Sequence, residues 1–162
     1  ERVYELKRRP RDKALNLNVA SLEEIYDFSK NQPCYLDQLY QAFLPGPLTI
    51  ILQANDRVPV WINSGMETVG FRIPKHPVTL DLIRKYGPLI GPSANLSGKA
   101  SGTSFQQIMM DFQEEVSGVE EDAALTGKDS TILDLSGEKA LILRQGAITR
   151  EDILAQVNDI KF

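Results

Sequence analysis

The stretch PGPLTIILQA, residues 45–54, decides the class of fold. Its first three residues break any preceding helix, because proline fixes φ and lacks the amide hydrogen that a helix needs. Residues 48–54 then form an apolar, β-branched run, which is typical of a strand buried inside a sheet. We therefore predict a buried strand over residues 48–54.

The segments on either side of this strand alternate between helical and extended patterns. Helical patterns, several with a capping residue or a breaking proline or glycine, cover residues 1–8, 21–31, 35–43, 76–87, 104–116 and 148–160. Extended patterns cover residues 14–20, 68–74, 88–94, 130–136 and 139–146. This interleaving predicts an α/β or α+β sheet, and the absence of long linkers predicts one domain over residues 1–162.

Composition limits the classes of function. The chain has one cysteine and one histidine among 162 residues, so neither an internal disulfide nor a zinc cluster can form. No apolar run approaches the roughly 20 residues of a membrane span, and we expect a cytoplasmic protein without membrane contact. The net charge is −4, yet residues 7–13 hold five basic residues and one acidic residue, which indicates a local anionic partner.

A loop rich in small polar residues, LIGPSANLSGKASGTS at residues 89–104, is the first candidate site. Gly91 would let the backbone approach a ligand closely, and the serine hydroxyls and amides can hold phosphate or carboxylate oxygens. Neither GxxxxGK[ST] nor GxGxxG is present, so an ordinary polar surface loop stays an alternative.

Basic side chains provide the second candidate. Lys7 and Arg9 suit phosphates, although a solvated helix end explains them equally well. Arg72 lies in an apolar strand facing away from Phe71 and needs a partner, which could be a ligand carboxylate or water. We expect His76 to be structural and Trp61 to pack.

Six segments together resemble one family: KRRPRDKAL, PGPLTIIL, GFRIPKHP, GPSANLSGKASGT, DSTILDL and LILRQGAI. Their order and spacing from Lys7 to Ile148 are similar to those of the YrdC-like threonylcarbamoyl-AMP synthases. The resemblance implies a twisted sheet of parallel and antiparallel strands, flanked by helices, with a basic cavity. It also leads us to expect that the family's Pro-Thr-(Glu/Asp)-Thr-Val-Tyr-Gly-Leu segment, with its strand and helix start, is missing before Glu1.

The activity implied by this resemblance joins L-threonine, bicarbonate and ATP, with Mg²⁺, into threonylcarbamoyl-AMP and pyrophosphate without a tightly bound cofactor. The product would supply the N6-threonylcarbamoyl group of adenosine 37 in tRNA through a downstream transferase machinery. One alternative is a non-catalytic module of the same fold that binds double-stranded RNA, tRNA or a nucleotide. Another is a paralogue that handles a different carbamoyl adenylate, as in hydrogenase-maturation proteins.

The resemblance also implies roles for individual residues. The catalytic positions would be Lys7, Arg9, Ser93 and Asn95. Residues at the ATP would be Arg9, Lys13, Thr68, Ser93, Ser101 and Arg144. Residues at the threonine would be Asn18, Arg72, Gly91 and Ser130, and no protein-held metal is expected. Asn18 stands where the family often has histidine, and Arg8 replaces its usual glycine.

Overall fold

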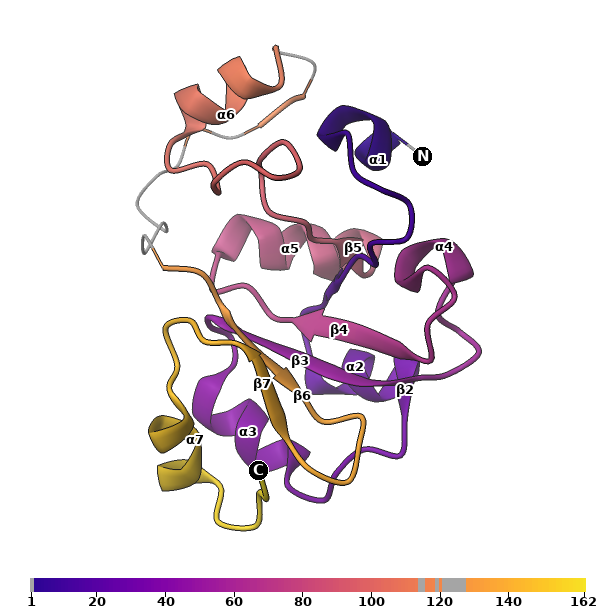
Figure 1. Cartoon of the computed structure of the whole chain (residues 1–162), viewed down its shortest axis with the longest axis vertical. Coiled ribbons are helices and arrows are strands. Elements are labelled where there is room, and N and C mark those ends of the chain that lie inside the picture. Colours follow the sequence, from indigo (N-terminus) through magenta and orange to yellow (C-terminus); the bar gives the residue numbers. More distant parts are fainter. Residues whose placement is uncertain (1, 114–115, 119, 121–127) are drawn as a thin grey trace. The chain divides into compact units, whose positions relative to one another are not determined.

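The computed structural model describes residues 2–113, 116–118, 120 and 128–162 (Figure 1). The chain divides into two compact units, one formed by Glu1–Lys13 with Pro92–Gly127 and the other by Ala14–Gly91 with Lys128–Phe162. We describe each unit by itself, and the prediction of one domain stays a prediction. In the described part of the chain, no helix has the length and apolar character needed to span a membrane.

The larger unit is built on a seven-stranded mixed sheet. Its strands are β1 (Leu17–Asn18), β2 (Ser29–Lys30), β3 (Leu48–Ala54), β4 (Thr68–Arg72), β5 (Leu89–Ile90), β6 (Thr131–Asp134) and β7 (Leu141–Arg144). The order is β5-β1-β4-β3-β6-β7, and β2 pairs with β3 outside this path. The predicted strand at 48–54 is confirmed as β3, which runs antiparallel to β4 and parallel to β6.

Five helices of the described residues flank this sheet, and their ends follow from local sequence. They are α2 (Leu22–Phe28), α3 (Leu36–Phe43), α4 (Val60–Asn63), α5 (Pro77–Tyr86) and α7 (Arg150–Gln156). His76 begins α5 by accepting a hydrogen bond from the amide of Thr79, which confirms its structural role. Gly87 ends α5 with a φ of 88°, a conformation that glycine adopts readily.

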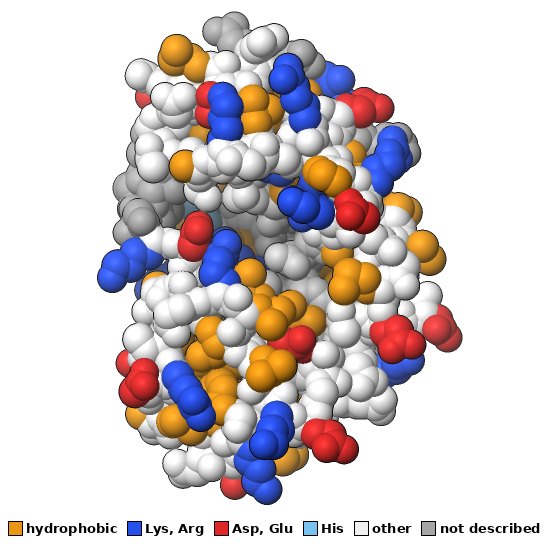
Figure 2. All heavy atoms as spheres, in the orientation of Figure 1, with side chains coloured by type: hydrophobic (Ala, Val, Ile, Leu, Met, Phe, Trp, Pro, Cys, Tyr) orange, Lys and Arg blue, Asp and Glu red, His pale blue; other side chains and the backbone are white. Residues whose placement is uncertain are grey.

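Side chains from the strands and the flanking helices form the core of this unit. The largest fully buried side chains are Val19, Ile25, Leu36, Leu39, Leu48, Ile50, Leu52, Phe71, Ile73, Ile83, Leu133 and Ile153. The edge strand β7 instead exposes Leu141 and Leu143, and Figure 2 shows hydrophobic side chains gathered over β6 and β7 on this face. The central strands, in contrast to β7, are stabilised by apolar side chains that are buried on both faces of the sheet.

Three predictions for this unit are wrong in detail, and one helix was not predicted. Ser29 and Lys30 form β2 rather than the end of a helix, because they pair with Gln53 and Ala54 of β3. The α4 helix was not predicted. The strand β5 is two residues long and half-buried, because it lies at the edge of the sheet. Trp61 is 57% exposed and does not pack in the core.

The smaller unit contains α1 (Arg2–Lys7), α6 (Phe105–Asp111) and the polar loop that precedes α6. The helix predicted over 104–116 ends at Asp111 in the described part of the chain, and its residues 114 and 115 lie outside the described residues. Ser104 caps α6 by accepting a hydrogen bond from the amide of Gln107, as predicted.

The end of α1 gives Arg8 a backbone conformation that favours glycine. The Arg9 amide bonds to the Tyr4 carbonyl at 2.9 Å and the Arg8 amide to the Glu5 carbonyl at 3.0 Å, which together make a Schellman motif. Arg8 occupies its left-handed position with a φ of 50°. A non-glycine residue there is strained by about 1–2 kcal/mol.

Candidate functional site

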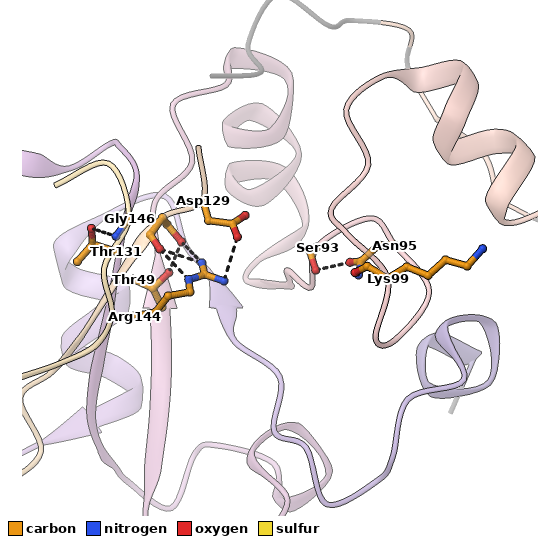
Figure 3. A network of polar contacts seen from close by, with 9 residues as sticks. Thr49, Ser93, Asn95, Lys99, Asp129, Thr131, Arg144 and Gly146 are labelled. Atoms are coloured by element: carbon orange, nitrogen blue, oxygen red, sulfur yellow. Dashed lines mark hydrogen bonds and ion pairs between the residues drawn. The ribbon is translucent and has the colours of Figure 1, made fainter. Parts of the chain in front are cut away.

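Six predicted site residues belong to two polar clusters, each within one unit. We call them the Lys7 cluster, formed by Lys7, Ser93 and Asn95, and the Arg144 cluster, formed by Thr49, Arg72, Asp129, Ser130 and Arg144. Figure 3 shows Ser93 and Asn95 of the first cluster and Thr49, Asp129 and Arg144 of the second.

In the Lys7 cluster, a buried ammonium holds the polar loop to the end of α1. Lys7 is 4% exposed, and its Nζ donates to the Ser93 and Asn95 carbonyl oxygens, with Asn95 Oδ1 at 3.4 Å. The Ser97 amide donates back to the Lys7 carbonyl at 2.8 Å. All the hydrogen-bonding capacity of the ammonium is therefore directed at this loop.

Asn95 is the centre of the loop. Its Nδ2 donates to the carbonyls of Leu96 and Lys99, at 3.0 and 2.7 Å, and its Oδ1 accepts from the Ser93 hydroxyl. Each atom of the amide has a partner, and the residue is 8% exposed. The physical reason for asparagine in this signature is that one planar amide closes the turn and also contacts the ammonium of Lys7.

Burial lowers the pKa of Lys7 below its usual range, and the nearby positive charge of Arg9 lowers it further. Two cations held side by side favour an anion between or beside them. Arg9 is partly exposed to solvent, and its Nε donates to the Lys13 carbonyl at 3.1 Å. Lys13 and Ser101 lie at exposed positions of the same unit.

The Arg144 cluster lies at one end of the sheet because strand register brings its members together. Arg72 is the last residue of β4 and pairs with Thr49 near the start of the antiparallel β3. It also pairs with Asn18 at the end of the parallel β1. Ser130 precedes β6, and Arg144 ends the antiparallel β7.

Arg144 is anchored by three hydrogen bonds to one residue. Its Nε and Nη2 donate to the Ser130 carbonyl at 3.1 and 2.8 Å, and Nη2 also reaches Ser130 Oγ at 3.2 Å. Its Nη1 forms an ion pair with Asp129 at 3.5 Å. Ser130 Oγ lies 3.2 Å from Thr49 Oγ1, inside the sheet.

The turn behind Arg144 is fixed by Thr131 and Gly146. Thr131 Oγ1 donates to the Ile148 carbonyl at 2.6 Å and accepts from the amides of Gly146 and Ile148 at 3.0 and 3.1 Å. A Cβ at Gly146 would lie 2.3 Å from the Asp129 carbonyl oxygen, so only glycine allows this approach of the two chain segments.

Arg72 is the member of the cluster that lacks a partner. Its Nε is buried and makes no hydrogen bond. Burial lowers the pKa of Arg72, the charge of Arg144 lowers it further, and Asp129 opposes the change. A buried, charged donor beside a second guanidinium is satisfied by a bound anion such as a carboxylate.

Asn18 pairs with Arg72 across β1 and β4, and Gly91 directly follows β5. Asn18 Oδ1 is a second buried polar atom without a hydrogen bond. A Cβ at Gly91 would lie 2.3 Å from the Asn18 side chain, so glycine makes room for it. An unsatisfied acceptor next to an unsatisfied donor fits a ligand that carries both kinds of group, as an amino acid does.

The structure separates Thr68 from this cluster. Thr68 begins β4 and Arg72 ends it, about 13 Å away at roughly 3.3 Å per residue. Thr68 instead lines a cavity of about 520 Å³ together with Gln53, Asn63 and Glu67. Thr49 and Asp129 were not predicted as members of the site. Thr49 is the polar residue of an otherwise apolar buried stretch, and that pattern could have indicated it.

Comparison with known proteins shows the family of the chain. The Sua5/YciO/YrdC family model, which is described as "Telomere recombination", matches residues 1–146. The chain belongs to this family.

A threonylcarbamoyl-AMP synthase of Bacillus subtilis is 36% identical over 163 residues, which cover 99% of this chain and 47% of that protein. A threonylcarbamoyl-AMP synthase of Pyrococcus abyssi is 34% identical, with 99% and 48% covered. The crystal structure of Pyrococcus abyssi Sua5 complexed with L-threonine superposes with a TM-score of 0.88 at 35% identity, covering 99% of this chain and 48% of that one. The chain thus spans about half the length of these relatives.

Proposed function

We propose that this member of the Sua5/YciO/YrdC family is a threonylcarbamoyl-AMP synthase domain. It would convert L-threonine, bicarbonate and ATP into threonylcarbamoyl-AMP, pyrophosphate and water. The observation that carries the proposal is the Arg144 cluster, in which the buried Nε of Arg72 has no protein partner. The names of its relatives, and the relative solved with L-threonine, support the same assignment.

In this proposal the Arg144 cluster binds the amino acid. The carboxylate of threonine would accept from Arg72, and Ser130, Asn18 and the backbone at Gly91 would complete the pocket. The carboxylate would also relieve the repulsion between the guanidiniums of Arg72 and Arg144. Arg144 would face the nucleotide with the Nη1 group that Asp129 now holds.

The Lys7 cluster would supply positive charge and ordered loop groups for the phosphates. Arg9 would contact the phosphates directly, while Lys7 would hold Ser93 and Asn95 in place and add its charge. Lys13, Ser101 and Thr68 remain proposed nucleotide contacts. Mg²⁺ would arrive on the phosphates of ATP, as is usual for this ion. The described residues include no group of three His, Cys, Asp or Glu side chains suited to a metal.

The chemistry needs positioning more than a protein nucleophile. Threonine and bicarbonate first form a carbamate with loss of water. A carbamate oxygen then attacks the α-phosphorus of ATP, and the bond to pyrophosphate breaks. Both reactants are anions, so holding them together against their repulsion is the main task of the site.

The product would pass to a transferase that modifies adenosine 37 of tRNA. That role would place the protein in the cytoplasm, with tRNA or double-stranded RNA as a further possible contact. We assign the enzyme to the nucleotidyltransferases, because an AMP group is transferred from pyrophosphate to the carbamate.

Pyrophosphate release tests the proposal. With L-threonine, bicarbonate and MgATP present, we expect release that stops when any one of the three is left out. Replacing L-threonine by L-alanine or D-threonine provides the matched control. Binding of MgATP or RNA without threonine-dependent release would favour the non-catalytic module instead.

A further inference from the structure

Thr49 is a polar residue in the most buried part of the sheet. It is 2% exposed, and its neighbours in β3, Leu48 and Ile50, are fully buried. A buried hydroxyl is unfavourable unless it is hydrogen-bonded. The Thr49 hydroxyl lies within hydrogen-bond distance of Ser130 Oγ, at 3.2 Å.

The register of the sheet sets Thr49 between the two arginines of the Arg144 cluster. Thr49 pairs with Arg72 across β3 and β4, and directly opposed residues of an antiparallel pair point to the same face. Through Ser130, the Thr49 hydroxyl is one hydrogen bond away from Nη2 of Arg144. Thr49 therefore contacts Ser130, which orients the guanidinium of Arg144, and it lies on the same face of the sheet as Arg72.

Hydrogen-bond capacity decides what this contact does. A serine hydroxyl has two lone pairs and one hydrogen. Ser130 Oγ already accepts from Arg144 Nη2 at 3.2 Å. If Thr49 donates to the other lone pair, both acceptor positions of Ser130 Oγ are filled. The Ser130 hydroxyl can then make a further hydrogen bond only as a donor.

We propose that Thr49 is a positioning residue that donates to Ser130 Oγ and thereby fixes Ser130 as a hydrogen-bond donor toward an anionic group of the substrate. Ser130 then presents its hydrogen and Arg72 its Nε–H to the same anion. The proposal rests on the proposed function for the identity of the anion, the carboxylate of L-threonine, and not for the hydrogen-bond network itself.

Three variants test the role. Thr49→Val keeps the shape of the side chain and removes the hydroxyl, Thr49→Ser keeps the hydroxyl, and Thr79→Val removes a hydroxyl that contacts His76 on α5. By titration calorimetry on the full chain, Thr49→Val should weaken L-threonine binding about 5- to 10-fold, the range for one lost hydrogen bond. Thr49→Ser should restore the affinity, and Thr79→Val should leave it unchanged.

A double-mutant cycle with Ser130→Ala shows whether Thr49 acts through Ser130. We expect Thr49→Val to change threonine affinity by less than about twofold when Ser130 is already alanine. In pyrophosphate release, Thr49→Val should raise the KM for threonine by a larger factor than the KM for ATP. An equal rise in both, or losses that add up in the double variant, would overturn the proposal.

A readout without ligand keeps the inference separate from the proposed function. The Nη2–H of Arg144 that donates to Ser130 Oγ, followed by ¹H–¹⁵N NMR at low temperature and identified with Arg144→Lys, should be sharp in the unmodified chain. Thr49→Val should broaden it by freeing the Ser130 hydroxyl, while Thr79→Val should not. If the unmodified chain binds no L-threonine, the proposed function fails, and the NMR result alone decides on Thr49: an unchanged Arg144 signal refutes it.

Discussion

At the scale of single residues, the two polar clusters consist of charged groups and hydroxyls with few, well-defined hydrogen-bond partners. Arg72 is the clearest case, because its buried Nε has no hydrogen-bond acceptor among the described residues. Burial of such a group without a partner weakens the folded state. For this reason we propose that Arg72 serves binding rather than stability.

Replacing Arg72 tests this. Arg72→Ala should weaken L-threonine binding about 10- to 100-fold, the range for a hydrogen bond to a charged group, and change MgATP binding far less. Calorimetric titration of each ligand separately measures both effects. Arg72→Lys, which keeps the charge but loses the planar donor group, should recover part of the affinity. Equal losses for both ligands would contradict a role at the amino acid.

Arg8 provides a second prediction, concerning stability. Arg8→Gly should raise the free energy of unfolding by about 1 kcal/mol, because glycine adopts the left-handed φ of 50° at the end of α1 without strain. Arg8→Ala is the matched control, since it removes the charge but keeps the Cβ. Urea unfolding measures both variants. A gain with alanine as large as with glycine would mean that charge, and not backbone strain, is responsible.

At the scale of helices and strands, local sequence predicted most boundaries, since caps and breakers act within a few residues. Gly87, Ser104 and Thr149 end or begin helices where expected. The errors fall where pairing over long distances outweighs local pattern. Ser29 and Lys30 continue a helical pattern, yet they pair with Ala54 and Gln53 of β3.

The capping box of α7 gives a prediction with a defined pH dependence. Asp152 and Thr149 exchange hydrogen bonds, with 2.8 Å from the Thr149 amide to Oδ2 and 3.1 Å from the Asp152 amide to Oγ1. Hydrogen bonding of the carboxylate to the backbone amide and then to the side chain of Thr149 lowers the pKa of Asp152. A carboxyl whose pKa is lowered on folding stabilises the protein above its unfolded pKa, about 3.9, and this stabilisation disappears as the pH falls through the folded pKa.

Asp152→Asn should therefore be less stable than the unmodified chain at pH 7, and the difference should shrink as the pH falls through the folded pKa of Asp152. Thermal unfolding of both chains from pH 7 into the acid range measures it. Asp159→Asn, which removes a nearby carboxylate outside the capping box, is the control for the loss of one charge. A difference that persists at low pH would remove Asp152 ionisation as the cause.

At the scale of the whole chain, the two compact units differ in how much they bury. Every fully buried large side chain of the described residues belongs to the larger unit. The smaller unit buries Tyr4 and Phe112 together with the polar Lys7 and Asn95. Segments with few buried apolar contacts open more easily than a packed sheet.

Hydrogen–deuterium exchange should show this difference. We expect amides of residues 92–104 to exchange at least about tenfold faster than those of β3 and β4. Addition of MgATP should slow exchange in residues 92–104, whereas L-threonine should act first on the residues around Arg72 and Ser130. Protection of β3 no greater than that of the polar loop would contradict the burial pattern.

How far the site could be predicted also depends on scale. The residues Asn18, Arg72, Ser130 and Arg144 were expected in the site, and the register of four strands brings them to one end of the sheet. Thr49 was not expected, because a lone threonine in an apolar strand has several explanations until its pairing is known. Thr68 lies at the other end of β4 from Arg72 and stays a proposed nucleotide contact outside the Arg144 cluster.

The pairing of β3 with β6 has a consequence for how the chain folds. Thr49 and Ser130 are 81 residues apart in sequence, and Lys7 and Asn95 are 88 apart. Contacts between such distant segments form slowly, because a long loop must close before they contribute. During synthesis, β3 and β4 leave the ribosome long before β6. Until β6 is available, the edge of β3 that pairs with it has no β6 partner, and the amino-terminal half must avoid aggregation in that state. Neither polar cluster can therefore be assembled until well over half of the chain has been synthesised.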